Sequence, residues 1–465
     1  MEELYLIKGK TLRGIANAIR SQKGTEELLD PAYYEDEILS IQSGGGEGKL
    51  ALVVSANQDI NEGGYDITAD DLKGVTEIRD YAFYGCAIKT ADLRNVTKIG
   101  RDAFQDAYYL ESVQFNPNGV QMDAQSFDDW SPIWTNNTDE EGFTVIAKNL
   151  CSFSGSLIDG VLNIKNGVEI IADNIDLPYD MTQVVLPEGL KVIGGNAFNY
   201  KSSLSTITFP TTIEEIKWDA FSNTGITVLD LSNAHSLKSI RRAFISMNLE
   251  NVILPEGLEE VSDYAFQHSY IKEITIPSTV KSFGIYSFQS SNVENVFFNG
   301  DVNDWANIDF NDSYGNPARI ADNFYIGGNL LEGAITIIPK EAEVKYDTFW
   351  NQKKITSVVI ENGSNESIRI ASRAFYECKG LTYVELPSNI RWIDSKAFAT
   401  SSQYPNQLLP KRTYVVKSYT VPFIEEDTFL NNNIEKIIVP VGCGETYKTA
   451  TNWTTVADYI EEATE

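Results

Sequence analysis

The stretch Ile193–Phe221, IGGNAFNYKSSLSTITFPTTIEEIKWDAF, contains one full period of a sequence repeat. It begins and ends with the pattern I-x-x-x-A-F, whose phenylalanines, Phe198 and Phe221, are 23 residues apart. Between them lies a short apolar run, LSTITFP, that ends at Pro210. Alternating apolar residues predict a short strand, and proline ends a strand because it has no N–H to donate.

The same phenylalanine recurs along most of the chain, at Phe83, Phe104, Phe127, Phe198, Phe221, Phe244, Phe266, Phe288, Phe349, Phe375, Phe398 and Phe429. Most neighbouring members of this series are between 21 and 26 residues apart. A period of this length is typical of leucine-rich solenoids. One repeat cannot bury its strands and its phenylalanine alone, so neighbours must stack around a continuous core. We therefore expect a β-rich, mixed α/β leucine-rich-repeat solenoid with repeats of about 23 residues.

Three wider intervals interrupt the period. Residues 128–165, 299–340 and 400–416 are interpreted as insertions or decayed repeats. The solenoid is expected to span residues 50–440, and a C-terminal cap is expected over residues 441–465.

The first 42 residues predict a helical hairpin for attachment or oligomerisation, joined to the solenoid by a glycine-rich linker at residues 43–49. Two helices of this size bury too little surface to be stable alone, so we expect them to pack on another chain or on their own copies. The alternative is a hairpin without a partner. The candidate attachment face contains Leu12, Ile15, Ile19, Tyr34, Ile38 and Ile41.

The charge of the chain argues against several function classes. It has 66 acidic and 37 basic side chains, a net charge of −29, which disfavours binding to nucleic acid because phosphates need clustered cations. No apolar run approaches the roughly 20 residues of a membrane-spanning helix.

The N-terminus lacks the apolar region of a secretory signal, so synthesis in the cytoplasm is expected, although removal of a signal would leave the same sequence. The four cysteines form no CxxC motif and are expected to be reduced.

Catalytic motifs are also missing from the sequence. There is no G-x-S-x-G motif, and the two histidines are not spaced as metal ligands. We therefore predict no enzyme activity, catalytic residue, cofactor or metal. The abundant carboxylates leave an acidic-pair hydrolase and a calcium site open as alternatives.

Binding is the function that the residues favour. The outward positions of successive strands should form a ladder of polar side chains, and the candidate contacts are Thr206, Thr208, Asp230, Asn251, Glu273, Thr275, Tyr383 and Glu385. Trp130 and Trp134 lie in a polar insertion, where indole rings could stack on a sugar. The alternative is an ordinary solvated sheet, with the two indoles covering the edge of a decayed repeat.

The repeats resemble the BspA-like leucine-rich repeats, most closely in YAFYGCAIKTADL and RAFYECKGLTYVELP. The resemblance spans roughly residues 70–460 and includes an irregular repeat and a C-terminal cap. It implies a surface or secreted recognition protein without known catalytic residues.

The N-terminal stretch LYLIKGKTLRGIANAIRSQKGTEELLDPAYYEDEILSIQ is similar to a leader on tail-fibre proteins of phages and prophages of Gram-positive bacteria. It implies a virion protein, a phage tail fibre that adheres to its host through the solenoid. The implied partners are other tail or baseplate proteins, a bacterial surface glycan or protein, and copies of the chain in a homotrimer, without membrane insertion. A bacterial cell-surface or secreted BspA-like adhesin is the alternative, and a capsule depolymerase is less favoured.

Overall fold

The computed structural model describes residues 65–401 and 408–464. The hairpin predicted for residues 1–42, with Leu12, Ile15, Ile19, Tyr34, Ile38 and Ile41, and the linker at residues 43–49 lie outside the described residues. No helix in the described ranges is long and apolar enough to cross a membrane.

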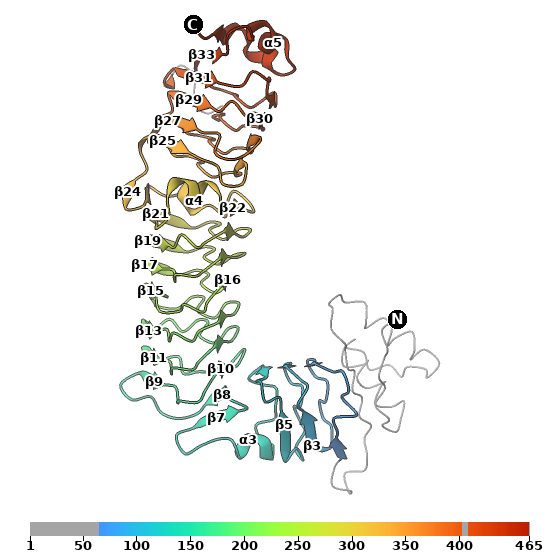
Figure 1. Cartoon of the computed structure of the whole chain (residues 1–465). Coiled ribbons are helices and arrows are strands. Elements are labelled where there is room, and N and C mark those ends of the chain that lie inside the picture. The colour runs from blue at the N-terminus through green and yellow to red at the C-terminus, as the bar shows by residue number, and fades with distance from the viewer. Residues whose placement is uncertain (1–64, 402–407, 465) are drawn as a thin grey trace, which may run out of the picture. The chain divides into compact units, whose positions relative to one another are not determined.

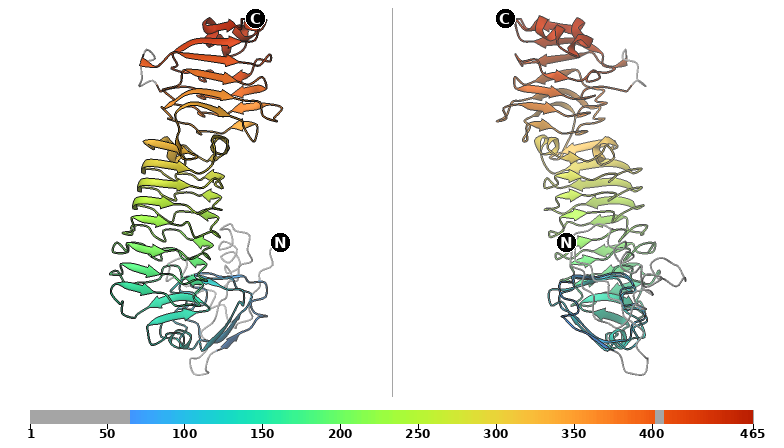
Figure 2. Two further views of the ribbon diagram at one scale, coloured as in Figure 1. Left: turned by 60° about the vertical axis from the view of Figure 1, so that its left-hand side comes forward. Right: turned by 90° about the vertical axis from the view of Figure 1, so that its right-hand side faces the viewer.

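The described chain forms two compact units, which are treated separately. Unit 1 contains residues 65–203 and 216–220, and unit 2 contains residues 204–215, 221–401 and 408–464. In each unit most repeats supply two strands, one to each of two rows. Row A contains the strands that follow a repeat phenylalanine, and row B contains those that precede it. Figure 1 shows successive strands of unit 2 stacked as rungs, and Figure 2 shows the same rungs in green to red from two further sides.

Unit 1 is built from short parallel sheets. Its row A consists of β1 (Tyr65–Ile67), β3 (Ile88–Leu93), β5 (Ser112–Phe115), β9 (Val161–Asn163) and β11 (Gln183–Val185). Its row B consists of β2 (Glu77–Ile78), β4 (Lys98–Ile99), β6 (Gln121–Met122), β8 (Asn149–Phe153), β10 (Ile170–Ile171) and β12 (Val192–Ile193). The strand β7 (Phe143–Ile146) pairs antiparallel with β8, and the short helix α3 (Pro132–Thr135) precedes this hairpin.

Unit 2 has longer sheets. Its row A consists of β13 (Thr206–Thr208), β15 (Val228–Asp230), β17 (Asn248–Ile253), β19 (Tyr270–Ile276), β21 (Asn292–Phe298), β23 (Asn323–Ile326), β25 (Gly333–Ile337), β27 (Ile355–Ile360), β29 (Tyr383–Leu386), β31 (Arg412–Val416), β33 (Ile434–Val439) and β34 (Ile460–Glu462). Its row B consists of β16 (Ser239–Ile240), β18 (Glu260–Val261), β20 (Ser282–Phe283), β22 (Asp309–Phe310), β26 (Glu343–Val344), β28 (Ile368–Ile370), β30 (Ile390–Ile393) and β32 (Phe423–Ile424). The strand β24 (Asn329–Leu330) pairs antiparallel with β23, and β14 (Glu215–Ile216) lies at the sequence boundary of the units.

The repeat phenylalanines form the core, as predicted. All twelve are buried, and in most adjacent repeats their rings stack on one another. The centroids of Phe83 and Phe104 are 4.9 Å apart in unit 1, and those of Phe244 and Phe266 are 5.6 Å apart in unit 2. The predicted β-rich leucine-rich-repeat solenoid is therefore confirmed, although it contains little helix.

Most turns around a repeat phenylalanine contain left-handed backbone at residues other than glycine. In one repeat Tyr264 and His268 have φ of 59° and 58°, and in the next Tyr286 and Ser290 have φ of 57° and 55°. Two left-handed residues four positions apart turn the chain tightly around the ring. His268 thus has a backbone role in this turn, and its N–H donates to Gln289 O at 2.9 Å.

The three intervals interpreted as insertions contribute regular strands. The first supplies β7, β8 and β9, and the second supplies β22, β23, β24 and β25. In the third, β31 (Arg412–Val416) pairs with β29 and β33, so the repeat resumes before residue 416.

The second interval also contains the helix α4 (Val302–Ala306) and the 3-10 helix η3 (Pro317–Arg319). Asp301 caps α4 through hydrogen bonds from the N–H groups of Asn303 and Asp304. Trp305 is fully buried, and its Nε1 donates to Thr348 O at 2.9 Å. This irregular repeat is therefore joined to the repeat that follows it.

The C-terminal end of unit 2 contains α5 (Gly444–Thr449), η5 (Trp453–Tyr459) and β34. Trp453 is fully buried and donates from Nε1 to Pro422 O at 2.8 Å. Tyr447 donates from its hydroxyl to Ser418 O at 2.7 Å. These contacts close the last turn of the core with aromatic side chains.

Candidate binding site

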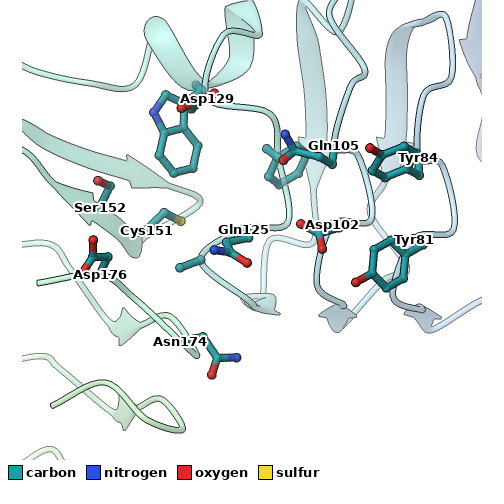
Figure 3. Close-up of a pocket in the computed structure, with 13 residues that line it drawn as sticks. Tyr81, Tyr84, Asp102, Gln105, Gln125, Asp129, Cys151, Ser152, Asn174 and Asp176 are labelled. Atoms are coloured by element: carbon teal, nitrogen blue, oxygen red, sulfur yellow. The ribbon is translucent and has the colours of Figure 1, made fainter. Parts of the chain in front are cut away.

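A groove of about 580 Å³ lies in unit 1. Its lining includes Tyr81, Tyr84 and Trp134 together with the buried Phe127, and we call it the tyrosine–tryptophan groove. The turns after β2, β4, β6 and β10 supply most of its lining, and α3 supplies Trp134. Figure 3 shows Tyr81 and Tyr84 on one side and Ser152 and Asp176 on the other, with Gln125 between them.

The two tyrosines present exposed rings because they lie in the turn around Phe83. Tyr81 has φ of 60°, which directs it outward two residues before that buried ring. Tyr81 and Tyr84 are 48% and 49% exposed, and their centroids are 6.1 Å apart. Hydrogen bonding with Asp102 raises the pKa of Tyr81, and hydrogen bonding with Asp106 raises that of Tyr84. Both hydroxyls therefore keep their protons at neutral pH.

The loop that carries Trp134 is held by a buried carboxylate. Asp128 is 1% exposed and accepts hydrogen bonds from Trp130 N at 2.8 Å and Gln105 Nε2 at 3.1 Å. Ile133 N donates to Leu110 O at 3.2 Å, which fixes α3 on the preceding repeat. These contacts hold Trp134 beside the groove.

Polar groups alternate with the rings. The groove is also lined by the side chains of Asp102, Gln105, Gln125, Asp129, Ser152, Asn174 and Asp176. Asn174 donates to Asp123 Oδ2 at 2.6 Å and accepts from Asn196 Nδ2 at 2.9 Å. Burial raises the pKa of Asp123, and the hydrogen bond from Asn174 acts against this effect. Aromatic faces beside amides and carboxylates suit a ligand rich in hydroxyl groups.

The one thiol in the groove is not suited to nucleophilic chemistry. Burial raises the pKa of Cys151 to about 12, so the thiol remains protonated at neutral pH. The groove therefore provides contacts for binding and no activated cysteine.

The two tryptophans of the polar insertion differ in exposure. Trp134 is half-buried and lines the groove, whereas Trp130 is 81% exposed and is not among the lining residues. Pro132 at the start of α3 redirects the chain between them. The contact of either indole with a ligand remains a prediction.

The strand register of row A places several of the candidate contacts next to one another, although Ile253 lies between Asp230 and Thr275. Asn251 is in register with Glu273, and Asp230 and Thr275 are both in register with Ile253. Thr206, Thr208 and Asp230 are exposed, whereas Asn251, Glu273 and Thr275 are half-buried. Their contact with a ligand stays a prediction.

The ladder residues on β29 are already bound to one another. Tyr383 donates from its hydroxyl to Glu385 Oε2 at 2.7 Å, and Lys417 pairs with the same carboxylate. Burial, followed by the hydrogen bond to Glu385, raises the pKa of Tyr383 to about 12. A ligand would have to displace or join these contacts.

The sequence reasoning missed the two tyrosines of the groove and the aromatic continuation of the ladder. Phe297 on β21 stacks on Tyr325 on β23, with centroids 4.7 Å apart. The outward position of Phe297 follows from the same strand register, so this pair could have been found. Tyr81 and Tyr84 carried no signal beyond their places next to Phe83.

Comparisons with known proteins give the following matches. The family described as BspA type leucine rich repeat region matches in six copies, over residues 76–175, 177–294, 231–338 and 342–449. A search of curated proteins finds no significant match.

Several solved structures are similar to this chain. A leucine-rich repeat protein from Bacteroides ovatus is 19% identical, with a TM-score of 0.35, and the match covers 84% of this chain and 88% of that one. A leucine rich cell surface protein from Faecalibacterium prausnitzii is 16% identical, with a TM-score of 0.31, and the match covers 84% of each chain. The pneumococcal vaccine antigen PcpA is 14% identical, with a TM-score of 0.32, and the match covers 86% of this chain and 88% of that one.

Proposed function

The chain belongs to the BspA-type leucine-rich repeat family, and on this basis we propose that it is a non-enzymatic adhesin of a bacterial surface that binds a saccharide. The proposed site is the tyrosine–tryptophan groove. The family match lies between residues 76 and 449 and supports this cell-surface reading, whereas the tail-fibre hypothesis rests on residues 1–42, which lie outside the match.

The observation that carries the proposal is that aromatic rings and polar side chains line the same groove. Tyr81, Tyr84 and Trp134 offer aromatic faces to the C–H faces of a sugar. Gln125 and Asn174 offer both donors and acceptors to its hydroxyl groups. Since the two kinds of group come from several repeats, the groove can recognise a ligand longer than one sugar ring.

The test is a screen of the full chain against an array of bacterial surface glycans, followed by titration with the best ligand. We expect Tyr84→Ala and Trp134→Ala to weaken binding by about tenfold each, since ring contacts are worth roughly 1 kcal/mol or more. Tyr419→Ala is a matched control, because Tyr419 is 75% exposed and lies in unit 2. Folded protein that binds no glycan, or an equal loss with Tyr419→Ala, would contradict the proposal.

A phage tail fibre is the second candidate, and the sequence of residues 1–42 favours it. In this reading the segment joins the chain to a tail or forms a homotrimer, and the solenoid contacts the host. Gold labelling of the protein in electron micrographs distinguishes particles from cell surfaces. Deletion of residues 1–42 should also lower the number of chains per oligomer, measured by light scattering. An unchanged number of chains would contradict the role in oligomerisation.

A capsule depolymerase would create new reducing ends on the glycan that it cleaves. We expect none when the full chain is incubated with each glycan that it binds. Glycoside hydrolysis uses a pair of carboxyl groups, and the carboxylates that line the groove are Asp102, Asp129 and Asp176. Release of reducing ends that Asp102→Asn abolishes would overturn the non-enzymatic assignment.

A further inference from the structure

A second aromatic surface lies in unit 2, in the turns after row B strands. Tyr264, Tyr286 and Tyr314 follow β18, β20 and β22. The ring centroids of Tyr264 and Tyr286 are 5.6 Å apart, and those of Tyr286 and Tyr314 are 5.8 Å apart. Tyr264 and Tyr314 are exposed and Tyr286 is half-buried. Three tyrosine side chains thus lie next to one another along the solenoid.

Two arginines extend this surface across the irregular repeat. The guanidinium of Arg319 lies 5.0 Å from the ring centroid of Tyr314 and 4.1 Å from that of Trp350. The guanidinium of Arg373 lies 4.8 Å from Trp350 and 4.5 Å from the ring centroid of Tyr346. We call Tyr264, Tyr286, Tyr314, Arg319, Trp350 and Arg373 the aromatic–arginine ladder.

Hydrogen bonds from two repeats hold Arg319 in place. Its Nη1 donates to Ser313 O at 2.8 Å, and its own carbonyl oxygen accepts from Asn351 Nδ2 at 2.8 Å. Gln352 Nε2 donates to the neighbouring Ala318 O at 2.8 Å. Because the backbone of Arg319 is fixed, less conformational entropy is lost when its side chain binds a ligand.

The two arginines differ in their ion pairing. Among the described residues, no carboxylate oxygen lies within 4 Å of Arg319, in a chain whose net charge is −29. Arg373 pairs with Asp347 Oδ1 at 3.0 Å, but the Asp347 side chain is fully buried. Burial and then the neighbouring Arg319 lower the pKa of Arg373, as expected for two neighbouring cations that repel each other. An anion placed beside both arginines would relieve this repulsion.

We propose that the aromatic–arginine ladder binds a polysaccharide that carries carboxylate groups. The planar guanidinium of arginine matches a carboxylate in two parallel hydrogen bonds. The tyrosine rings provide stacking faces for the adjoining sugars. This site goes beyond the groove of unit 1, since it shares no residue with it and selects for charge.

The probe is polygalacturonate, titrated into the full chain by calorimetry. Its methyl ester is the matched ligand control, because esterification removes the charge and keeps the sugar chain. We expect binding of polygalacturonate and at least about tenfold weaker binding of the ester. Equal binding of the two polymers, or no binding of polygalacturonate, would overturn the proposal. Binding of poly(glycerol phosphate) without polygalacturonate would overturn the choice of a carboxylate.

Substitutions locate the site. Arg319→Gln should weaken binding by about tenfold, whereas Arg94→Gln, at a 57% exposed side chain of unit 1, should change it less than about twofold. Arg319→Lys keeps the charge but loses the planar fork, and an intermediate loss is expected. Circular dichroism melting verifies that each variant is folded. Equal losses for Arg319→Gln and Arg94→Gln would contradict the assignment.

Variants of unit 1 separate this proposal from the function proposed above. Tyr84→Ala and Trp134→Ala should retain full binding of polygalacturonate. If they abolish it while Arg319→Gln has no effect, the acidic polysaccharide occupies the groove and the ladder assignment is wrong.

Discussion

Phe375 stacks on Phe398 with ring centroids 5.3 Å apart and ring planes only 3° from parallel. Both rings are fully buried, and each belongs to a different repeat. The same contact joins Phe349 to Phe375 and Phe398 to Phe429. A repeat therefore completes its core only when its neighbour is folded, which couples the stability of adjacent repeats.

We expect Phe375→Ala to lower the free energy of unfolding by about 3–5 kcal/mol, because it leaves a cavity between two rings. Phe375→Leu should have a smaller effect, since it keeps most of the buried volume. Urea unfolding measures both, with the exposed Tyr419→Ala as the control. A loss below about 1 kcal/mol for Phe375→Ala would contradict a shared phenylalanine core.

Trp305→Phe tests the join between the irregular repeat and the next. The substitution removes the hydrogen bond from Trp305 Nε1 to Thr348 O while it keeps an aromatic ring. A loss of about 1–3 kcal/mol is expected, with faster hydrogen exchange near residue 348. Trp392→Phe is the control, because Trp392 is 47% exposed. Equal effects of the two substitutions would rule out a specific role for the buried bond.

Thiol labelling reports how the cysteines are packed. Burial raises the pKa of both Cys151 and Cys378 to about 12, so at pH 8 only about one thiol in 10⁴ is ionised. Cys443 is half-buried, and iodoacetamide should modify it first in the native protein. Cys151 and Cys378 should react only after unfolding. Mass spectrometry that finds Cys151 and Cys443 labelled at equal rates would refute this packing.

The cap should lose stability in acid through Glu462. Its carboxylate accepts hydrogen bonds from Gly442 N at 3.0 Å and Gly444 N at 2.8 Å, and these bonds lower its pKa. The contribution to stability is therefore present above the ordinary value of 4.5 and is lost as pH falls through the lower pKa of the folded state.

Glu462→Gln should lower the melting temperature at pH 7 and reduce the further loss below pH 4.5. The exposed neighbour Glu461 provides the matched control, as Glu461→Gln. Parallel melting-temperature profiles for wild type and Glu462→Gln between pH 7 and pH 3 would show that the carboxylate does not stabilise the cap.

The periodic part of the fold could be predicted because each repeat needs the same buried residue at the same place. Phe198 and Phe221 alone reveal the period, and the alternation around Thr206 and Thr208 predicts which side chains point outward. The left-handed turns could not be predicted, since residues such as Tyr264 occupy positive φ where glycine is the usual signal.

The candidate groove was only partly predictable. Trp134 drew attention as an indole in a polar insertion, but Tyr81 lies 53 residues before it in the sequence. Only the stacking of repeats brings their side chains to one groove. The contrast between Trp134 and the exposed Trp130 likewise depends on how Asp128 holds the loop, and its hydrogen bond from Gln105 is a tertiary contact that local pattern does not encode.

A crystal structure of the full chain with the glycan that binds most tightly tests the central claim most directly. We predict ligand density in the tyrosine–tryptophan groove, with sugar rings against Tyr84 and Trp134 and hydroxyl groups within hydrogen-bond distance of Gln125 or Asn174. Density confined to the outward face of row A, with the groove unoccupied at saturating ligand, would contradict the proposed site.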